Sequence, residues 1–475
     1  MFLTKRKSKL FTAFAYLVLL CCCLTFLNPS AVLADGEQDL QLQILAINDF
    51  HGTLESKTLN DKPIGGAAVL AGYLNKWEED AAEGAHTLRV HAGDAIGASH
   101  PISALLQDEP TLKILGEAGF TYGCPGNHEF DEGIEELLRL QNGGPHPQTE
   151  PYTGSWPRAS TEYLCANVVD KQTGQTVFSP YAVSEIDGIK VGFIGAALEE
   201  TPTIVVPSGV ASLDFLDTAD SVNTYVGELK TQGVETIIVL LHQGGEGDRQ
   251  GGTISGPIVD IVNAIDDEVD VVVSGHTHTG FWGAINGKIV TQAYSNGTAF
   301  ADIDLTIDRQ TKDVSAKSAR IVDTYHEAGT PADSTVAALV NQYRELAAPI
   351  SNQVVGTAAY DLTKDQNHAG ESALGNLIAD AQRWKMGSEL AFMNPGGIRA
   401  NLTAGEATWG DLYTVQPFNN TLVKMNLSGA QIDTLLEQQW LDQSYPRIFA
   451  GIRPELYLGS RQGGRRTGGS GRYPY

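Results

Sequence analysis

Short apolar runs of strand length alternate with amphipathic stretches through residues 40–322, and this alternation constrains the fold most strongly. Five runs are rich in β-branched and aliphatic residues: 42–47, 87–91, 191–196, 236–241 and 269–274. Helical spacing marks the stretches between them: 65–79, 102–118, 217–232 and 257–265. Such alternation predicts a layered α/β domain. Two later runs, 288–292 and 299–307, are followed by no helix, so we expect antiparallel strands that make a mixed sheet or sandwich.

The chain has 475 residues, which is too long for one ordinary core and favours two domains. A helix over 331–350, capped by Asp333 or Ser334, is expected to join them. The second domain begins near Val354, and we predict a helix over 373–385, a strand over 390–393 and strands within 414–425. Residues 143–160 are rich in Gly, Pro and Ser and indicate an exposed insertion.

The first 34 residues have the pattern of a secretory signal peptide. Basic residues precede the apolar run 10–27, and Val32 and Ala34 form a cleavage site before Asp35. A membrane anchor is the alternative, because the apolar run has nearly the length needed to span a bilayer. We expect a protein that is secreted or associated with the cell envelope, with no stable transmembrane anchor after cleavage.

The formal net charge is −25 at pH 7. Nucleic-acid polymers require basic patches, so no such polymer is expected as a partner. A small phosphate substrate is compatible with this charge, because bound metal ions reverse the local sign. Of the five cysteines, only Cys124 and Cys165 follow the signal peptide, and the sequence leaves open whether they pair or are simply two buried thiols.

Six polar motifs lie at or just beyond the ends of the apolar runs. They are Asn48-Asp49-Phe50-His51-Gly52, Gly93-Asp94, Gly126-Asn127-His128-Glu129-Phe130-Asp131, His242-Gln243-Gly244-Gly245, Gly275-His276-Thr277-His278 and Asn394-Pro395-Gly396-Gly397-Ile398-Arg399. Each alone is weak, since a single Asp or His at a strand end is more often a cap. Together they indicate one site, because the carboxyl ends of strands in an α/β sheet converge. Mixed carboxylate and imidazole ligands suit Zn²⁺ or Mn²⁺ rather than Ca²⁺.

The spacing of residues within two of the motifs predicts the direction of their side chains. Asp49 and His51 are two residues apart, as are His276 and His278. In an extended backbone, side chains two residues apart point to the same side. We therefore expect each pair to face one point.

This motif set is similar to that of the calcineurin-like metallophosphoesterases, and its longer forms resemble the 5′-nucleotidase family within that superfamily. The resemblance covers about residues 40–447. It implies a four-layer α/β/β/α sandwich over 35–328, a linker helix over 329–352 and a smaller α+β substrate-binding domain over 353–447.

The resemblance also implies ligand roles for two divalent ions, Zn²⁺, Mn²⁺ or similar. Asp49, His51 and His278 would hold the first ion. Asn127, His242 and His276 would hold the second, with Asp94 bridging both. Two such ions clamp a phosphoryl group and lower the pKa of a bound water.

Further roles follow from the same resemblance. His128 would stabilise charge on the phosphoryl oxygens while Asp131 orients its ring, although His128 could instead only support its neighbours. Glu129 reads as a helix-start residue. Asn394, Arg399 and Phe418 match substrate-contacting positions, with a surface salt bridge as the alternative for Arg399 and a core position for Phe418. An arginine that some members carry is missing from 371–376, which leaves fewer positive groups for phosphate.

The last stretch, 448–475, is rich in Arg and Gly and has no helical or strand period. We interpret it as a frameshifted tail, with a genuine disordered basic tail as the alternative. On that interpretation the second domain is incomplete, poorly stable and weak in nucleotide affinity, while the catalytic domain folds and binds metal.

The sequence thus predicts a secreted two-metal phosphoesterase that hydrolyses nucleoside 5′-monophosphates to nucleoside and phosphate. A 2′,3′-cyclic-nucleotide phosphodiesterase or a UDP-sugar hydrolase would use the same ligands. The alternative outside the enzymes is an inactive remnant or a metal- or phosphate-binding protein. The native metal, the preferred nucleotide and the oligomeric state stay open.

Overall fold

The computed structural model describes residues 38–367, 371–418 and 420–437 of the chain. The chain divides into two units, Met1–Leu40 and Gln41–Tyr475, and nearly everything described belongs to the second. The predicted signal peptide, residues 1–34, and the predicted aberrant tail, residues 448–475, lie outside the described residues.

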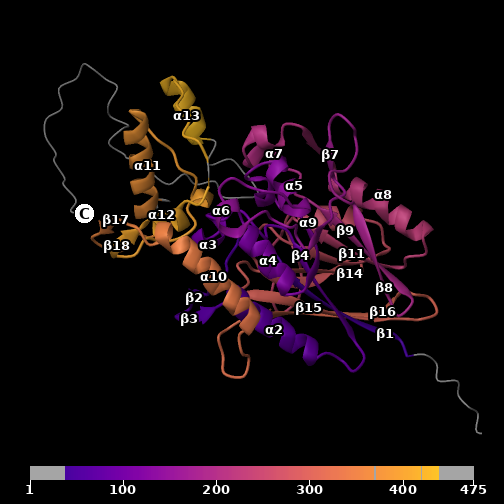
Figure 1. The fold of residues 1–475 in the computed structure, drawn as a ribbon. Coiled ribbons are helices and arrows are strands. Elements are labelled where there is room, and N and C mark those ends of the chain that lie inside the picture. The colour runs from indigo at the N-terminus through magenta and orange to yellow at the C-terminus, as the bar shows by residue number, and fades with distance from the viewer. Residues whose placement is uncertain (1–37, 368–370, 419, 438–475) are drawn as a thin grey trace, which may run out of the picture. The chain divides into compact units, whose positions relative to one another are not determined.

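Two six-stranded sheets form the N-terminal domain (Figure 1). The first has the order β16-β15-β1-β4-β5-β6 and the second the order β13-β14-β12-β11-β9-β8. The strands of the first are β1 (Leu40–Ile47), β4 (His86–Ala92), β5 (Phe120–Cys124), β6 (Glu162–Tyr163), β15 (Ala299–Ile307) and β16 (Val314–Asp323). Those of the second are β8 (Tyr181–Ile186), β9 (Ile189–Ala196), β11 (Thr236–Leu241), β12 (Val269–Ser274), β13 (Gly280–Ile285) and β14 (Lys288–Ala293).

Strand direction places the polar motifs. In the first sheet β4 runs parallel to both β1 and β5, with Ile47 opposite His91. In the second sheet β11 runs parallel to β9 and β12, with Leu241 opposite Ala196 and Ser274. The loops after these strands therefore leave each sheet from one edge, and strand β4 of the first sheet contacts β11 and β12 of the second. All seven predicted strands of this domain are present, and β15 is antiparallel to β16 as expected, but β14 pairs parallel with β12 and antiparallel only with β13.

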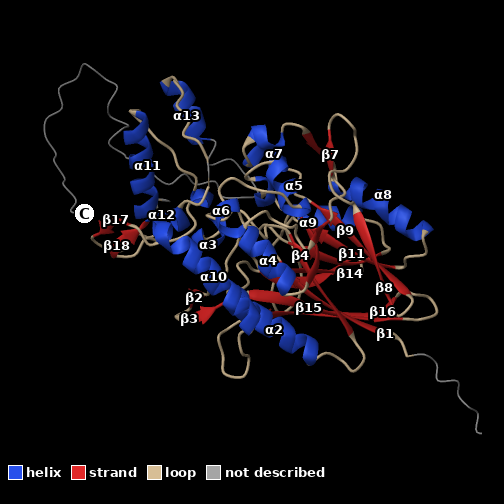
Figure 2. Ribbon diagram, in the orientation of Figure 1, coloured by secondary structure: helices blue, strands red, loops and turns tan. Residues whose placement is uncertain are grey.

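Helices cover the outer face of each sheet. α2 (Ala67–Glu79), α4 (Glu109–Glu117) and α10 (Ser334–Ser351) share one apolar core with the side chains of β1 and β5. α8 (Thr218–Thr231) and α9 (Ile258–Ala264) share another with β9, β11 and β12. Figure 2 shows the strands grouped together, with α8 and α2 well separated from each other. The predicted four-layer sandwich is confirmed.

Two local predictions are wrong. The stretch 102–118 is not one helix but α3 (Pro101–Ala104) and α4, because Gln107 and Asp108 have φ values of 54° and 57° that break the helix. The stretch 143–160 is not a simple exposed insertion. Trp156 is buried, and its Nε1 donates to the carbonyl of Leu140 at 2.7 Å. This contact ties the segment to the core.

Smaller elements complete the domain. A hairpin of β2 (Lys57–Leu59) and β3 (Lys62–Ile64) precedes α2. The others are the helices α5 (Ile134–Asn142), α6 (Glu150–Thr153) and α7 (Thr201–Ile204), the strands β7 (Val168–Asp170) and β10 (Leu213–Phe215), and the 3₁₀ turns η1 (His128–Phe130) and η2 (Pro207–Val210). Cys124 and Cys165 are buried and unpaired, as the two-thiol interpretation expects.

α10 leads into a smaller domain. Its predicted cap is confirmed, because Asp333 Oδ1 accepts a hydrogen bond from the backbone N–H of Val336 at 2.8 Å. Beyond it, β17 (Val354–Ala358) pairs antiparallel with β18 (Gly405–Thr408). The other elements are α11 (Ala373–Met386), η3 (Pro395–Gly397), α12 (Trp409–Val415) and α13 (Gly429–Glu437). α11 confirms the helix predicted over 373–385.

The strands predicted over 390–393 and within 414–425 are wrong. Residues 409–415 form α12, whose start is fixed by a reciprocal capping box between Thr408 and Asp411. Residues 420–428 are exposed and pair with no strand in the part of the chain that is described. Within that part, no helix has the length and apolar character that crossing a bilayer requires.

Candidate metal centre

Strained loops bring the polar motifs together. Five of the seven predicted ligands have positive φ: Asp49 and His51 (50° each), Asp94 (49°), His276 (78°) and His278 (57°). Non-glycine residues seldom adopt this region, and such strain concentrates at functional sites. Backbone hydrogen bonds from Asp49 N to Gly93 O (3.0 Å) and from His51 N to Asp94 O (2.9 Å) hold two of the loops. The expectation of extended backbone at these pairs is therefore wrong, although their side chains do converge.

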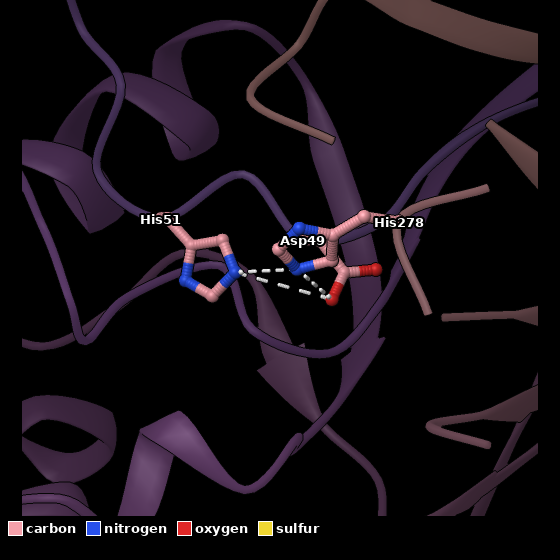
Figure 3. A group of neighbouring side chains, drawn as sticks. All are labelled: Asp49, His51 and His278. Atoms are coloured by element: carbon pink, nitrogen blue, oxygen red, sulfur yellow. Dashed lines mark hydrogen bonds and ion pairs between the residues drawn. The ribbon is translucent and has the colours of Figure 1, made fainter. Parts of the chain in front are cut away.

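The first group consists of Asp49, His51 and His278 (Figure 3). The Nε2 atoms of His51 and His278 are 3.1 Å apart. Asp49 Oδ1 lies 3.2 Å from His278 Nε2 and 4.0 Å from His51 Nε2. Three ligand atoms from the loops after β1 and β12 thus face one point.

The second group consists of Asp94, His242 and His276. His242 Nε2 is 3.1 Å from Asp94 Oδ2, and His51 Nε2 of the first group is 3.9 Å from the same oxygen. Asp94 Oδ2 therefore lies between the two groups. This is the position that a bridging carboxylate requires.

Backbone carbonyls set the orientation of two of the imidazoles. His51 Nδ1 is 3.0 Å from Gly97 O, and His242 Nδ1 is 2.8 Å from Ala92 O. A neutral imidazole that donates through Nδ1 presents the lone pair of Nε2 inward. Both rings are thereby prepared as nitrogen ligands.

The charges of the centre also fit divalent cations. Asp49 and Asp94 are 0% and 1% exposed. Among the described residues, their ion-pair partners are all histidines. Burial favours neutral Asp94, but His242 and His128 outweigh it and hold the pKa of this carboxyl well below its usual range. Asn127 Oδ1 is buried without a hydrogen-bond partner. Buried anions and an orphaned oxygen are what a metal ion would satisfy.

His128 stands beside this centre with the partner predicted for it. His128 Nδ1 is 2.8 Å from Asp131 Oδ2, and its backbone N–H donates to Asp94 Oδ1 at 2.9 Å. Burial lowers the pKa of His128, but the carboxylates of Asp131 and Asp94 raise it above the ordinary value overall. The imidazole can therefore carry positive charge next to a phosphoryl group.

Two of the three predicted substrate residues reach the centre from the smaller domain. Arg399 Nη2 is 3.4 Å from His51 Nε2, and its guanidinium lies 5.9 Å from the ring centre of Phe418. The Phe418 ring stacks on that of His128, with centroids 5.5 Å apart and planes 23° apart. Asn394 is exposed at the start of η3, and within the described ranges its side chain has no hydrogen bond to a metal-ligand residue.

Sequence reasoning missed several residues of the site. Asn48 donates from Nδ2 to Asp49 Oδ2 at 2.6 Å and accepts from Ala293 N at 2.7 Å, which links the loop after β1 to the end of β14. Glu129 accepts hydrogen bonds from the loops after β4 and β5. Burial and the Asp94 charge raise the pKa of Glu129 to about 7, whereas the hydrogen-bond donors around it favour its charged form. Both residues belong to motifs that the sequence singled out, and this position was the only indication of a role at the site.

Two lysines add positive charge near Arg399. Burial, with Arg399 and Lys364, lowers the pKa of Lys57 to about 8. Burial and Arg399 also lower the pKa of Lys364. Lys57 begins β2 and Lys364 precedes α11. The two lysines are far apart in the sequence, so no local pattern could predict that both lie near Arg399. The expected shortage of positive groups is thus partly offset.

Comparisons with known proteins agree with this geometry. The family model described as calcineurin-like phosphoesterase matches residues 42–280, and the one described as 5′-nucleotidase, C-terminal domain, matches residues 354–468. The second match runs past residue 447 into the stretch interpreted as a tail.

Individual relatives give the same result. The chain is 40% identical to the Bacillus subtilis protein named endonuclease YhcR over 85% of this chain and 33% of that protein. It is 38% identical to the Listeria monocytogenes cell wall protein Lmo0130 over 87% of this chain and 58% of that protein. A solved 5′-nucleotidase precursor from Thermus thermophilus superposes with a TM-score of 0.69 at 26% identity, covering 86% of this chain and 81% of that one. The chain spans about a third of the length of YhcR and somewhat over half of the length of Lmo0130.

The two-sheet sandwich gathers candidate His and Asp ligands at the ends of its parallel strands, in the region that the calcineurin-like phosphoesterase model matches. The chain belongs to the calcineurin-like phosphoesterases, whose family model matches residues 42–280, and residues 354–468 match the C-terminal domain of 5′-nucleotidases.

Proposed function

We propose that this chain is an exported phosphoesterase that uses two divalent ions to hydrolyse nucleoside 5′-monophosphates. The observation that carries the proposal is the position of Asp94 Oδ2, which lies 3.1 Å from His242 Nε2 and 3.9 Å from His51 Nε2. One carboxylate oxygen therefore faces both ligand groups. A single-ion site or a structural site has no need of that arrangement.

The ligands divide as the resemblance implies. Asp49, His51 and His278 would hold one ion, whereas Asn127, His242 and His276 would hold the other, with Asp94 shared. When bound, the ions supply Lewis-acid stabilisation of the phosphoryl charge and a water of lowered pKa. Zn²⁺ and Mn²⁺ suit this mixture of imidazole, carboxylate and amide donors.

The chain's own residues supply the remaining chemistry. The His128 imidazolium, held by Asp131, donates a hydrogen bond to a phosphoryl oxygen as negative charge develops there. Arg399 reaches the same centre beside His51 and donates to the phosphate through its guanidinium. Lys57 and Lys364 add positive charge near Arg399 in a chain of net charge −25.

Phe418 supports the assignment of a nucleotide. An aromatic ring that stacks on a flat partner stacks equally well on a nucleobase, and one such contact is worth about 1–3 kcal/mol. Phe418→Ala is therefore expected to raise KM for AMP roughly 5- to 150-fold, by the conversion of about 1.4 kcal/mol per tenfold. Ribose 5-phosphate has no base and is the control substrate, and Phe418→Tyr is the control variant. Equal losses with AMP and ribose 5-phosphate would contradict a stacking role.

Metal removal tests the cofactor assignment. We expect chelation with EDTA to abolish phosphate release and Mn²⁺ to restore it. Thermal unfolding should also shift upwards with Mn²⁺, because an ion that binds only the folded chain at 100 times its Kd stabilises it by about 2.7 kcal/mol. Full activity after exhaustive chelation, with residual metal checked by mass spectrometry, would contradict the assignment.

Export is supported by the basic, apolar and small-residue pattern of residues 1–34. The name of the Listeria relative, a cell wall protein, points the same way. Cell fractionation of a strain expressing the full chain tests this part of the proposal. Accumulation in the cytoplasm with residues 1–34 intact would contradict it.

The relative named as an endonuclease makes nucleic acid a second candidate substrate. The acidic charge of the chain disfavours it, because phosphodiester polymers need many basic contacts.

One panel ranks the candidates: phosphate release or cleavage with AMP, a 2′,3′-cyclic nucleotide, UDP-glucose and a single-stranded DNA oligonucleotide, each with Mn²⁺ and with chelator. AMP should give the highest kcat/KM. Higher kcat/KM on another substrate would replace the nucleotidase assignment. Bound metal with no turnover on any substrate would favour the binding-protein alternative.

A further inference from the structure

Glu129 collects five hydrogen bonds beneath the metal centre. It is 3% exposed. Its Oε1 accepts from Ala95 N (2.8 Å), Ile96 N (3.3 Å) and the Tyr163 hydroxyl (3.1 Å). Its Oε2 accepts from Asp94 N (2.8 Å) and Gly126 N (2.5 Å). A residue expected only to begin a helix is therefore surrounded by donors.

Four of these donors are backbone N–H groups from two separate loops, and the fifth is the hydroxyl of Tyr163 on β6. Asp94, Ala95 and Ile96 follow β4, whereas Gly126 follows β5 and directly precedes the predicted ligand Asn127. One carboxylate thus binds the loop of Asp94 to the loop of Asn127. Without it, buried backbone N–H groups in both loops would lack partners, which is costly in a protein interior.

The two loops are packed too closely for another arrangement. A Cβ atom placed on Gly126 would lie 2.1 Å from Asp94 Oδ1 and 2.7 Å from His242 Cε1. The distances between Asp94, Asn127 and His242 therefore depend on the separation of the loops after β4 and β5, which Glu129 joins by hydrogen bonds. Small changes there move metal ligands directly.

We infer that Glu129 is a positioning residue that sets the separation of Asp94 and Asn127 and so determines how tightly the shared metal centre binds its ions. The inference rests on the proposed function, since it concerns the same ligands. Glu129 itself belongs to none of the candidate ligand groups among the described residues.

The two acceptor oxygens of the carboxylate are part of the role. Two carboxylate oxygens offer about four acceptor sites, and five donors converge on them. A glutamine has the same shape but only one acceptor oxygen, and its NH₂ group would face backbone N–H groups. An aspartate is one methylene shorter and cannot reach both loops at these distances.

The test is calorimetric titration of Mn²⁺ into the metal-free full chain and its variants. Glu129→Gln should weaken Mn²⁺ binding about 10- to 100-fold, the usual loss when a residue that orients metal ligands is changed. Tyr163→Phe removes one donor to Glu129 and should weaken it about three- to tenfold. Tyr122→Phe is the matched control, because its hydroxyl on β5 contacts Ser184 instead, and it should bind like the wild type.

The outcomes separate this inference from the proposed function. Absence of Mn²⁺ binding by the wild-type chain would overturn the proposed function and this inference with it. Wild-type affinity in a folded Glu129→Gln chain would overturn the inference alone, as would a lowered unfolding temperature with unchanged affinity. If Glu129→Gln does not fold, the comparison of Tyr163→Phe with Tyr122→Phe decides, and equal affinities would overturn the inference.

Discussion

Replacing His128 with alanine is expected to lower kcat for AMP hydrolysis by about 10²- to 10⁴-fold, the usual contribution of a positioned proton-donating side chain. The imidazole is held by Asp131 at 2.8 Å, and both neighbouring carboxylates raise its pKa. It therefore offers a charged donor beside the metal centre. The measurement is steady-state phosphate release at saturating Mn²⁺.

Controls separate this loss from damage to the fold. His128→Ala should bind Mn²⁺ nearly as the wild type does, because His128 is proposed as a donor to substrate rather than as a ligand. Asp131→Asn should lose less activity, since it leaves the imidazole in place. His86→Ala, at an exposed histidine paired with Asp187, should retain full activity. A fall of less than threefold for His128→Ala would remove His128 from the reaction.

Replacing Asp94 with asparagine is expected to reduce both metal binding and activity. Asp94 Oδ2 faces His242 of one group and His51 of the other, so its charge serves both ions. Metal ions stabilise the transition state by several kcal/mol, and about 4 kcal/mol corresponds to a loss in kcat/KM of roughly 10³-fold. Mn²⁺ stoichiometry, measured by mass spectrometry after desalting, should fall below two ions per chain.

A second buried aspartate provides the matched control for Asp94→Asn. Asp302 is 0% exposed and pairs with Arg320 across β15 and β16, away from the predicted ligands. Asp302→Asn should lower the unfolding temperature without changing Mn²⁺ stoichiometry. Retention of two ions and more than a tenth of the activity by Asp94→Asn would contradict the bridging role.

The core of the fold could be predicted because its signals are local. The apolar runs of β11 and β12 are buried along their full length and that of β9 at every position except Lys190, so burial and strand length coincide in the sequence. The linker helix could be predicted because its cap, Asp333, is also local. The strands proposed near 390 and 420 failed because a strand needs a partner, and nothing in the local sequence specifies one.

Some features of the candidate site could likewise be predicted from the sequence, and others could not. Its ligand types and their positions at strand ends were visible in the sequence, but the left-handed turns at Asp49, His51 and Asp94 were not. Those turns are imposed by neighbouring loops, through bonds such as His51 N to Asp94 O. Glu129 and Lys57 were missed for a related reason. Their partners lie on other elements, so only the assembled structure reveals what they do.

The central claim is that these strand ends build a centre for two metal ions that share Asp94. Anomalous diffraction from crystals of the full chain grown with Mn²⁺, recorded at the manganese edge, tests it most directly. The account predicts two peaks about 3.5–4 Å apart, the usual spacing in two-metal sites, with the Asp94 carboxylate in contact with both. A single peak, or peaks away from Asp94, would contradict it.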